Sequence, residues 1–178
     1  DLLADVESVG DPHALEQIEA RLRSTVADNP AARCAVSIAM WDLAAKRVDL
    51  PLYRLWGLDP SATPATSFTV GIDTTARMHE KAAAAAEAGY SVLKVKLGGD
   101  RDREIVEAVR EAAPAATLRV DANEAWTPRE AVTKSGWLAD LGVEFVEQPV
   151  PASNREGLRF VYERSALPIA ADESCVTA

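Results

Sequence analysis

The sequence has few cysteines, fewer basic than acidic residues and no long apolar run. Each of these shortages excludes a class of protein. Cys34 and Cys175 are its only cysteines, too few for a disulfide framework and without the spacing of a zinc site. The net charge of −9 and the lack of a basic run argue against a nucleic-acid-binding surface. No stretch is apolar over the length that a membrane-spanning helix needs. We therefore predict a cytoplasmic protein with reduced thiols and with neither nucleic-acid nor membrane partners.

Residues 1–60 carry the signals of helices. Asp11-Pro12 is typical of a helix N-cap followed by proline at the first helical position. An apolar stripe at helical spacing follows it, at Leu15, Ile18, Leu22 and Val26. Asn29-Pro30 gives the same start signal for a second, Ala-rich helix. The stretch from Asp59 to Pro64 has the composition of a linker, which predicts a domain boundary between residues 1–60 and 61–178.

Beyond the linker, β-prone runs alternate with helical segments. We expect strands at residues 67–72 and 91–97, two more that end at Asp121 and Glu147, and a fifth at residues 168–172. Strands that alternate with helices of this length form a parallel sheet, either open and doubly wound or closed as a barrel. These elements are about half of an eight-unit barrel, which takes about 250 residues. We therefore expect a chain that is incomplete at both ends.

Four of the expected strands end on a charged residue, and these ends recur at nearly constant spacing. They are Lys96, Asp121, Glu147 and Asp172, which stand 25, 26 and 25 residues apart. A single charged strand end is more often a capping or loop residue. Four at the spacing of a repeating βα unit are expected to meet at the carboxyl edge of one parallel sheet. The pattern therefore favours a functional site.

The charged strand ends predict a magnesium site with a lysine base beside it. Three convergent carboxylates repel one another, and a hard cation that prefers oxygen ligands, Mg²⁺, relieves that repulsion. Lys94 lies two residues before Lys96 and shares its face of the strand. A lysine next to a cation and a second ammonium group is a candidate proton-abstracting base. Because the cation also stabilises a developing enolate, these residues indicate removal of a proton α to a carboxylate.

Other residues near the strand ends have weaker signals. Taken alone, a Lys-x-Lys pair is more typical of the solvated face of an edge strand. Asn123 has the phase of Asp121 and is placed to orient a ligand oxygen, whereas Arg119 is expected only to pair with a carboxylate. We interpret Trp126 and Trp137 as packing residues.

At these positions the sequence resembles the enolase superfamily, over nearly the whole chain. Leu-Lys-Val-Lys-Leu-Gly at 93–98 is similar to the Lys-x-Lys strand of that superfamily. Its three metal-ligand strands are similar to Val-Asp-Ala-Asn at 120–123, Val-Glu-Gln-Pro at 146–149 and Ala-Asp-Glu-Ser at 171–174. The aspartate of the last motif makes the sequence resemble the muconate lactonizing enzyme subgroup. Mandelate racemases would be expected to carry glutamate at this position. Residues 30–57 are similar to the end of the capping domain of these enzymes.

The resemblance implies a fold. Residues 61–178 would supply strands 1–5 of a modified (β/α)₇β barrel, the first half of a TIM-like α/β barrel. Residues 1–60 would be the C-terminal helical part of an α+β capping domain. The resemblance places three further parts of the enzyme outside this sequence: a second catalytic lysine and the eighth-strand specificity residues after Ala178, and the capping loop before Asp1.

The resemblance also implies a mechanism. Mg²⁺ would be held by Asp121, Glu147 and Asp172, Lys96 would be the acid/base, and Lys94 would assist it by charge and hydrogen bonding. A lysine base with Mg²⁺ stabilising an enediolate is the general pattern of the superfamily. The partners would be a small-molecule carboxylate, either a dipeptide or an N-acyl amino acid, and further copies of the chain in a homo-oligomer.

The first strand narrows the implied reaction. Ser67 to Asp73 most resembles the first barrel strand of dipeptide epimerases of the L-Ala-D/L-Glu type. The alternatives within the superfamily are o-succinylbenzoate synthase, N-succinylamino acid racemase and muconate-type cycloisomerase. Two alternatives of other classes are a metal-dependent aldolase or lyase on a similar barrel and a non-catalytic half-barrel fragment.

Overall fold

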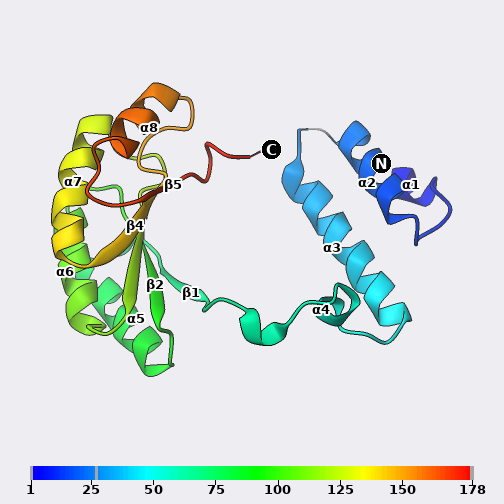
Figure 1. The fold of residues 1–178 in the computed structure, drawn as a ribbon, viewed down its shortest axis with the longest axis horizontal. Coiled ribbons are helices and arrows are strands. Elements are labelled where there is room, and N and C mark those ends of the chain that lie inside the picture. The colour runs from blue at the N-terminus through cyan, green and yellow to red at the C-terminus, as the bar shows by residue number, and fades with distance from the viewer. Residues whose placement is uncertain (1, 27, 177–178) are drawn as a thin grey trace. The chain divides into compact units, whose positions relative to one another are not determined.

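The computed structural model describes residues 2–26 and 28–176, and contacts divide the chain into two compact units, Asp1–Thr63 (unit 1) and Pro64–Ala178 (unit 2). The helices of unit 1 are α1 (Leu2–Glu7), α2 (Leu15–Thr25), α3 (Pro30–Arg47), α4 (Leu52–Leu55) and the short 3₁₀ helix η1 (Pro60–Ala62) (Figure 1). The interpretation of residues 1–60 as the end of a capping domain stays a prediction.

Helix α2 begins three residues later than the Asp11-Pro12 signal predicts. The Asp11 carboxylate accepts a hydrogen bond from the main-chain N–H of His13 (2.8 Å), so it closes a local turn instead of capping the helix. The N-cap residue is Ala14, which has no side-chain cap. The second start signal is confirmed, because the Asn29 side chain caps α3 by accepting from the N–H of Ala32 at 3.1 Å.

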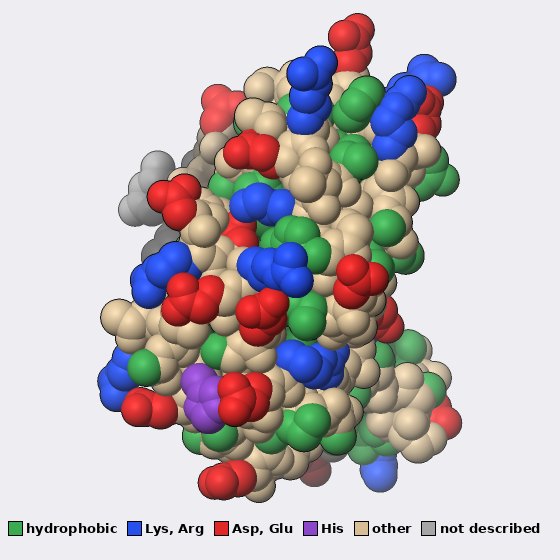
Figure 2. All heavy atoms as spheres, turned by 90° about the vertical axis from the view of Figure 1, so that its left-hand side faces the viewer, with side chains coloured by type: hydrophobic (Ala, Val, Ile, Leu, Met, Phe, Trp, Pro, Cys, Tyr) green, Lys and Arg blue, Asp and Glu red, His purple; other side chains and the backbone are tan. Residues whose placement is uncertain are grey.

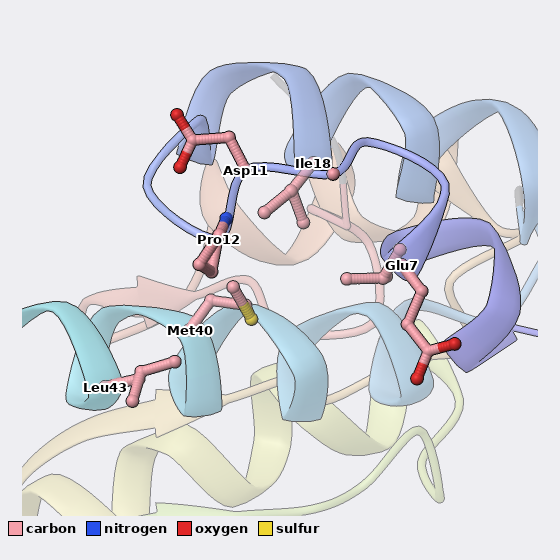
Figure 3. A pocket seen from close by; sticks show the side chains of 8 residues that line it. Glu7, Asp11, Pro12, Ile18, Met40 and Leu43 are labelled. Carbon is pink, nitrogen blue, oxygen red and sulfur yellow. The ribbon is translucent and has the colours of Figure 1, made fainter.

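Unit 1 contains an apolar hollow of about 320 Å³. Figure 3 shows Ile18 of α2 facing Met40 and Leu43 of α3 across it, with Glu7 and Asp11 nearby. Its mainly apolar lining differs from the chemistry of the predicted site, whose residues all belong to unit 2.

Unit 2 is a parallel sheet whose helices lie on one side. The strands are paired in sequence order: β1 (Ser67–Val70), β2 (Val92–Lys96), β3 (Thr117–Asp121), β4 (Val143–Glu147) and β5 (Ile169–Ala170). The helices between them are α5 (Thr75–Glu87), α6 (Asp102–Ala112), α7 (Pro128–Asp140) and α8 (Arg155–Tyr162). Figure 1 shows all four helices on the same side of the sheet. Doubly wound sheets carry helices on both faces, so this arrangement is that of a barrel wall.

The fifth strand is shorter than residues 168–172, which the sequence predicts. It ends at Ala170, so Asp172 lies beyond the strand. The reason is local to β4: the chain turns aside at Gln148, where φ is +36°, and its main chain no longer runs alongside residues 171 and 172.

The core of unit 2 lies between the sheet and the helices. Alternate strand residues point toward the helices and are fully buried, among them Val70, Leu93, Val95, Leu118 and Val120. The helices meet them with equally buried residues, among them Met78, Val106, Val109, Leu138 and Val161. Because successive strand residues alternate between faces, the intervening residues of β2 and β3, such as Lys94 and Asp121, lie on the opposite face.

The outer surface of the helical layer is charged and mixed in sign. Figure 2 shows Lys and Arg side chains interspersed with Asp and Glu over this face. Pairs one helical turn apart include Arg103 with Glu107 and Arg159 with Glu163, each at 2.9 Å. Exposed pairs of this kind contribute little to stability, so this face needs no functional explanation. Within the described ranges, no helix combines the length and the apolar composition needed to cross a membrane.

Asp102 is a buried carboxylate that joins the loops after β2 and β3. One of its oxygens accepts hydrogen bonds from the main-chain N–H groups of Gly98 and Gly99, both at 2.9 Å. The other accepts from the Trp126 indole at 2.9 Å and from the Lys134 ammonium at 2.5 Å. Burial alone would raise the pKa of Asp102, but the hydrogen bonds from Gly98, Lys134 and Gly99 and the Lys134 charge lower it. Trp126 is buried here, as predicted for a packing residue.

We expect Asp102→Asn to lower the free energy of unfolding by about 3 kcal/mol at neutral pH, because it leaves the Lys134 charge without its buried partner. The folded-state pKa of Asp102 lies below the ordinary value of 3.8, so its contribution is present above that value. The contribution is lost as the pH falls through the folded-state pKa. In urea unfolding, the difference from wild type should be largest near neutral pH and shrink below about pH 4. The exposed Asp100→Asn should show no such difference, and an Asp102→Asn effect that persists unchanged in acid would contradict the expectation.

Candidate active site

The carboxyl ends of β2, β3 and β4 lie in register, which brings distant residues into one row. In the parallel ladder Lys96 pairs with Asp121, and Asp121 pairs with Glu147. Lys94, two residues earlier in β2, shares the face of Lys96. The row therefore combines two ammonium groups with two carboxylates from three strands.

These four side chains form a continuous ion-pair cluster. Lys94 Nζ lies 2.9 Å from Asp121 Oδ2 and 2.7 Å from Glu147 Oε1, so one ammonium group bridges both carboxylates. Lys96 Nζ lies 2.6 Å from the same Asp121 oxygen. Asp121 is fully buried, whereas the side chains of Lys94 and Lys96 are 22% and 26% exposed. The two lysines are therefore the most exposed members of the cluster, which suits contact with a substrate.

The cluster controls the charge states of its members. Burial alone would raise the pKa of Asp121, but hydrogen bonds from Lys96, Lys94 and the main-chain N–H of Asn123 lower it. Burial disfavours the ammonium form of Lys94, yet the hydrogen bonds to Glu147 and Asp121 raise its pKa overall. Lys94 therefore keeps its proton and suits the role of a charge partner.

Asn123 links Lys96 to a residue that the sequence reasoning missed. Its side-chain oxygen accepts a hydrogen bond from Lys96 Nζ at 2.7 Å, and its amide nitrogen donates to Glu173 Oε1 at 3.2 Å. Glu173 Oε2 is buried, with no hydrogen-bond partner among the described residues. The only sequence signal for Glu173 was its place between Asp172 and Ser174 in the last motif. Asn123 itself has φ +41°, a left-handed conformation of the kind that gathers at functional sites.

Asp172 lies at the same edge but outside the cluster. Its side chain is exposed, and its carboxylate makes no hydrogen bond or ion pair within the described part of the chain. In those ranges no three Asp, Glu, His or Cys side chains are grouped closely enough to hold a metal ion. The structure does position the main chain of Asp172, because its N–H donates a hydrogen bond to the Gln148 side chain at 2.9 Å. The role of Asp172 as a metal ligand stays a prediction.

Arg119 lies two residues before Asp121 in β3, where it is paired in register with Lys94. Its guanidinium forms an ion pair with Glu144 at 2.6 Å and donates to the Ser67 hydroxyl at 2.8 Å. The prediction that Arg119 pairs with a carboxylate is confirmed. Its partner is not one of the predicted ligands, so Arg119 supports the layer beneath the site.

The donor set suits a hard divalent cation. Asp121 and Glu147 supply oxygen from adjacent strand ends, and the chain after β5 carries Asp172 at the same edge. The Lys94 ammonium already lies between the first two carboxylates, at 2.9 and 2.7 Å, which shows that a positive charge is favoured there. Oxygen-only ligands of this kind favour Mg²⁺ over softer metals.

Comparison with protein families agrees with this geometry. Residues 77–178 match the family described as "Enolase C-terminal domain-like", and residues 4–57 match the N-terminal domain of the mandelate racemase / muconate lactonizing enzyme family. The chain belongs to the enolase superfamily. The resemblance inferred from the strand-end motifs is therefore confirmed, together with the α/β fold and its parallel sheet.

Similar enolase-superfamily proteins are named as epimerases. The L-Ala-D/L-Glu epimerase of Bacteroides thetaiotaomicron is 38% identical over 96% of this chain and 44% of its own length. The hydrophobic dipeptide epimerase of Enterococcus faecalis is 40% identical over 94% of this chain and 48% of its own. A crystal structure of the dipeptide epimerase from Enterococcus faecalis, complexed with Mg and the dipeptide L-Leu-L-Tyr, matches with a TM-score of 0.86 and 38% identity, over 98% of this chain and 51% of that one. The chain spans about half the length of the curated relatives it matches.

Proposed function

We propose that this chain carries the metal-binding and base-bearing part of an isomerase that acts on the proton α to a carboxylate. The observation that supports the proposal is the ion-pair cluster at the strand ends, in which Lys96 contacts Asp121 and Lys94 joins Asp121 to Glu147. It combines a base, a fixed positive charge and a carboxylate pair, which are the groups that α-proton abstraction requires.

Each side chain has a distinct part in the proposed reaction. Lys96 accepts the α-proton, and its contacts with Asp121 Oδ2 at 2.6 Å and Asn123 Oδ1 at 2.7 Å orient its amine. Lys94 assists by charge and hydrogen bonding, and offsets the negative charge that develops on the substrate. Asp121, Glu147 and Asp172 would hold Mg²⁺, which when bound supplies a Lewis acid for the substrate carboxylate.

We propose a dipeptide of the L-Ala-D/L-Glu type as the substrate. Two observations support this class over the other substrates of the superfamily. The relatives described above are named as an L-Ala-D/L-Glu epimerase and as dipeptide epimerases, and the crystal structure is of a complex with Mg and L-Leu-L-Tyr. In addition, the sequence from Ser67 to Asp73 resembles the first barrel strand of dipeptide epimerases.

The test is α-proton exchange in D₂O, followed by NMR, on the intact protein with Mg²⁺. L-Ala-L-Glu and a set of N-succinylamino acids would be offered in parallel. We expect deuterium to enter at the α-carbon of the dipeptide's C-terminal residue, with the other epimer accumulating, and expect EDTA to abolish the exchange.

Three other results would have different meanings. Exchange confined to N-succinylamino acids would keep the chemistry and replace the substrate. Exchange that persists in EDTA would remove the metal from the proposal. No exchange with any acid, although Mg²⁺ binding is measurable, would overturn the proposed activity.

A further inference from the structure

Gln148 follows Glu147 directly and is the largest polar side chain that unit 2 buries completely, as judged among the described residues. Its carboxamide makes four hydrogen bonds. The oxygen accepts from the N–H groups of Asp172 at 2.9 Å and Ser174 at 3.1 Å. The nitrogen donates to the carbonyl of Val150 at 2.8 Å and to the Ser174 hydroxyl at 2.7 Å. Two N–H donors on one side and a carbonyl on the other fix the orientation of the amide.

This side chain replaces a missing main-chain contact between β4 and the segment after β5. The N–H of Gln148 donates to the Ala170 carbonyl at 2.9 Å, as in a regular parallel ladder. The next bond of that ladder would join the Gln148 carbonyl to the N–H of Asp172. That carbonyl instead accepts from the N–H of Glu124 at 2.8 Å, because the chain turns through φ +36°. The Gln148 side-chain oxygen replaces this carbonyl as the acceptor for the N–H of Asp172.

This replacement of a main-chain contact by a side-chain contact affects how the neighbouring carboxylates of Glu147 and Asp172 are positioned. Strand β5 has only two residues, and the Asp172 side chain makes no bond of its own among the described residues. The Gln148 amide is therefore the contact that holds the Asp172 main chain next to the end of β4, where Glu147 projects. A peptide-like group buried among four partners has one low-energy arrangement, so it can hold two segments in register.

We propose that Gln148 is a positioning residue, which holds the Asp172 main chain next to the end of β4 so that the Asp172 and Glu147 carboxylates can bind one Mg²⁺ ion. The inference rests on the metal site of the proposed function and is independent of which substrate the protein uses. It assigns a role to a residue that sequence reasoning treated only as part of the Val-Glu-Gln-Pro motif.

The test compares Gln148→Met, Gln148→Glu and Val161→Ala with wild type in the intact protein. Methionine fills a similar volume but removes all four hydrogen bonds, and glutamate keeps an acceptor for the N–H groups of Asp172 and Ser174. Val161 is fully buried in α8, so its truncation is a control for loss of packing. Amide hydrogen exchange across residues 171–176 is measured without metal, and Mg²⁺ affinity is measured by calorimetry without substrate.

We expect Gln148→Met to expose the Asp172 and Ser174 amides to exchange and to weaken Mg²⁺ binding by about 10–100-fold, the usual cost of losing a group that orients a metal ligand. Gln148→Glu should retain the amide protection, and Val161→Ala should lower stability with Mg²⁺ affinity close to wild type. Wild-type protection or affinity in Gln148→Met would overturn the proposal, as would equal weakening in Val161→Ala. If these results are as expected and no dipeptide is epimerised, only the proposed activity fails.

Discussion

Replacing Lys96 with alanine is expected to lower the rate of α-proton exchange by about 10²–10⁴-fold, the usual contribution of a general base. The loss should appear in kcat, because Lys96 acts on the proton in transfer, whereas the groups proposed to bind the substrate carboxylate remain. Asp121 keeps two of its partners in this variant, Lys94 at 2.9 Å and the N–H of Asn123 at 2.9 Å. The variant should therefore fold, and circular dichroism would verify that it does.

The Lys96→Arg variant distinguishes between two roles for Lys96, that of a base and that of a charge partner of Asp121. An arginine keeps a positive charge next to Asp121 but cannot give up its proton in a protein. If Lys96 is the base, both variants should lose exchange. If it serves only as the charge partner of Asp121, the arginine variant should recover much of the activity. The matched control is Lys46→Ala in unit 1, which removes a lysine that is 73% exposed and paired with Asp42. It should leave the exchange rate unchanged.

Replacing Asp121 with asparagine is expected to weaken Mg²⁺ binding by more than the roughly 100-fold that loss of an outer group costs. The carboxylate is fully buried and contacts both lysines, and the register places it between Lys96 and Glu147. Asparagine has the same shape but no charge, so the two ammonium groups would then face only Glu147. Repulsion of a divalent cation by that excess positive charge adds to the loss of the ligand.

The same substitution should also reduce stability. Removing one partner of a buried ion pair costs about 3–5 kcal/mol, and we expect the lower end because both lysines reach solvent. Asp102→Asn is the matched control, since it removes an equally buried carboxylate from a lysine elsewhere in unit 2. It should destabilise the protein with little change in Mg²⁺ affinity. Calorimetric Mg²⁺ titrations of both variants decide the matter, and equal affinities would contradict the assignment of Asp121 as a ligand.

Much of the arrangement follows from the order of residues along the chain. A βα unit has a nearly constant length, so charged residues that close successive strands return to the same edge of a parallel sheet. Alternation along β2 places Lys94 and Lys96 on one face. These two periodicities predicted that Lys94, Lys96, Asp121, Glu147 and Asp172 meet, and that three convergent carboxylates need a compensating cation. The first four side chains do meet, whereas that of Asp172 lies outside their cluster.

Other features depend on contacts that no local pattern contains. The sequence did not show that Gln148 would divert its carbonyl to Glu124 and use its side chain to hold the chain at Asp172. It did not show that Asp102 would join two loops, or that Asp11 would close a turn before the start of α2. Each depends on hydrogen bonds whose partners are set by how the backbone bends.

The residue types at the site could thus be predicted from the sequence, because strand ends in a parallel sheet converge by geometry alone. The way these residues are held was not, because a buried polar group takes whichever partners the folded chain brings within reach. The residue types at this edge of the sheet follow from periodic spacing in the sequence. The contacts that hold these residues in place are set by the tertiary structure.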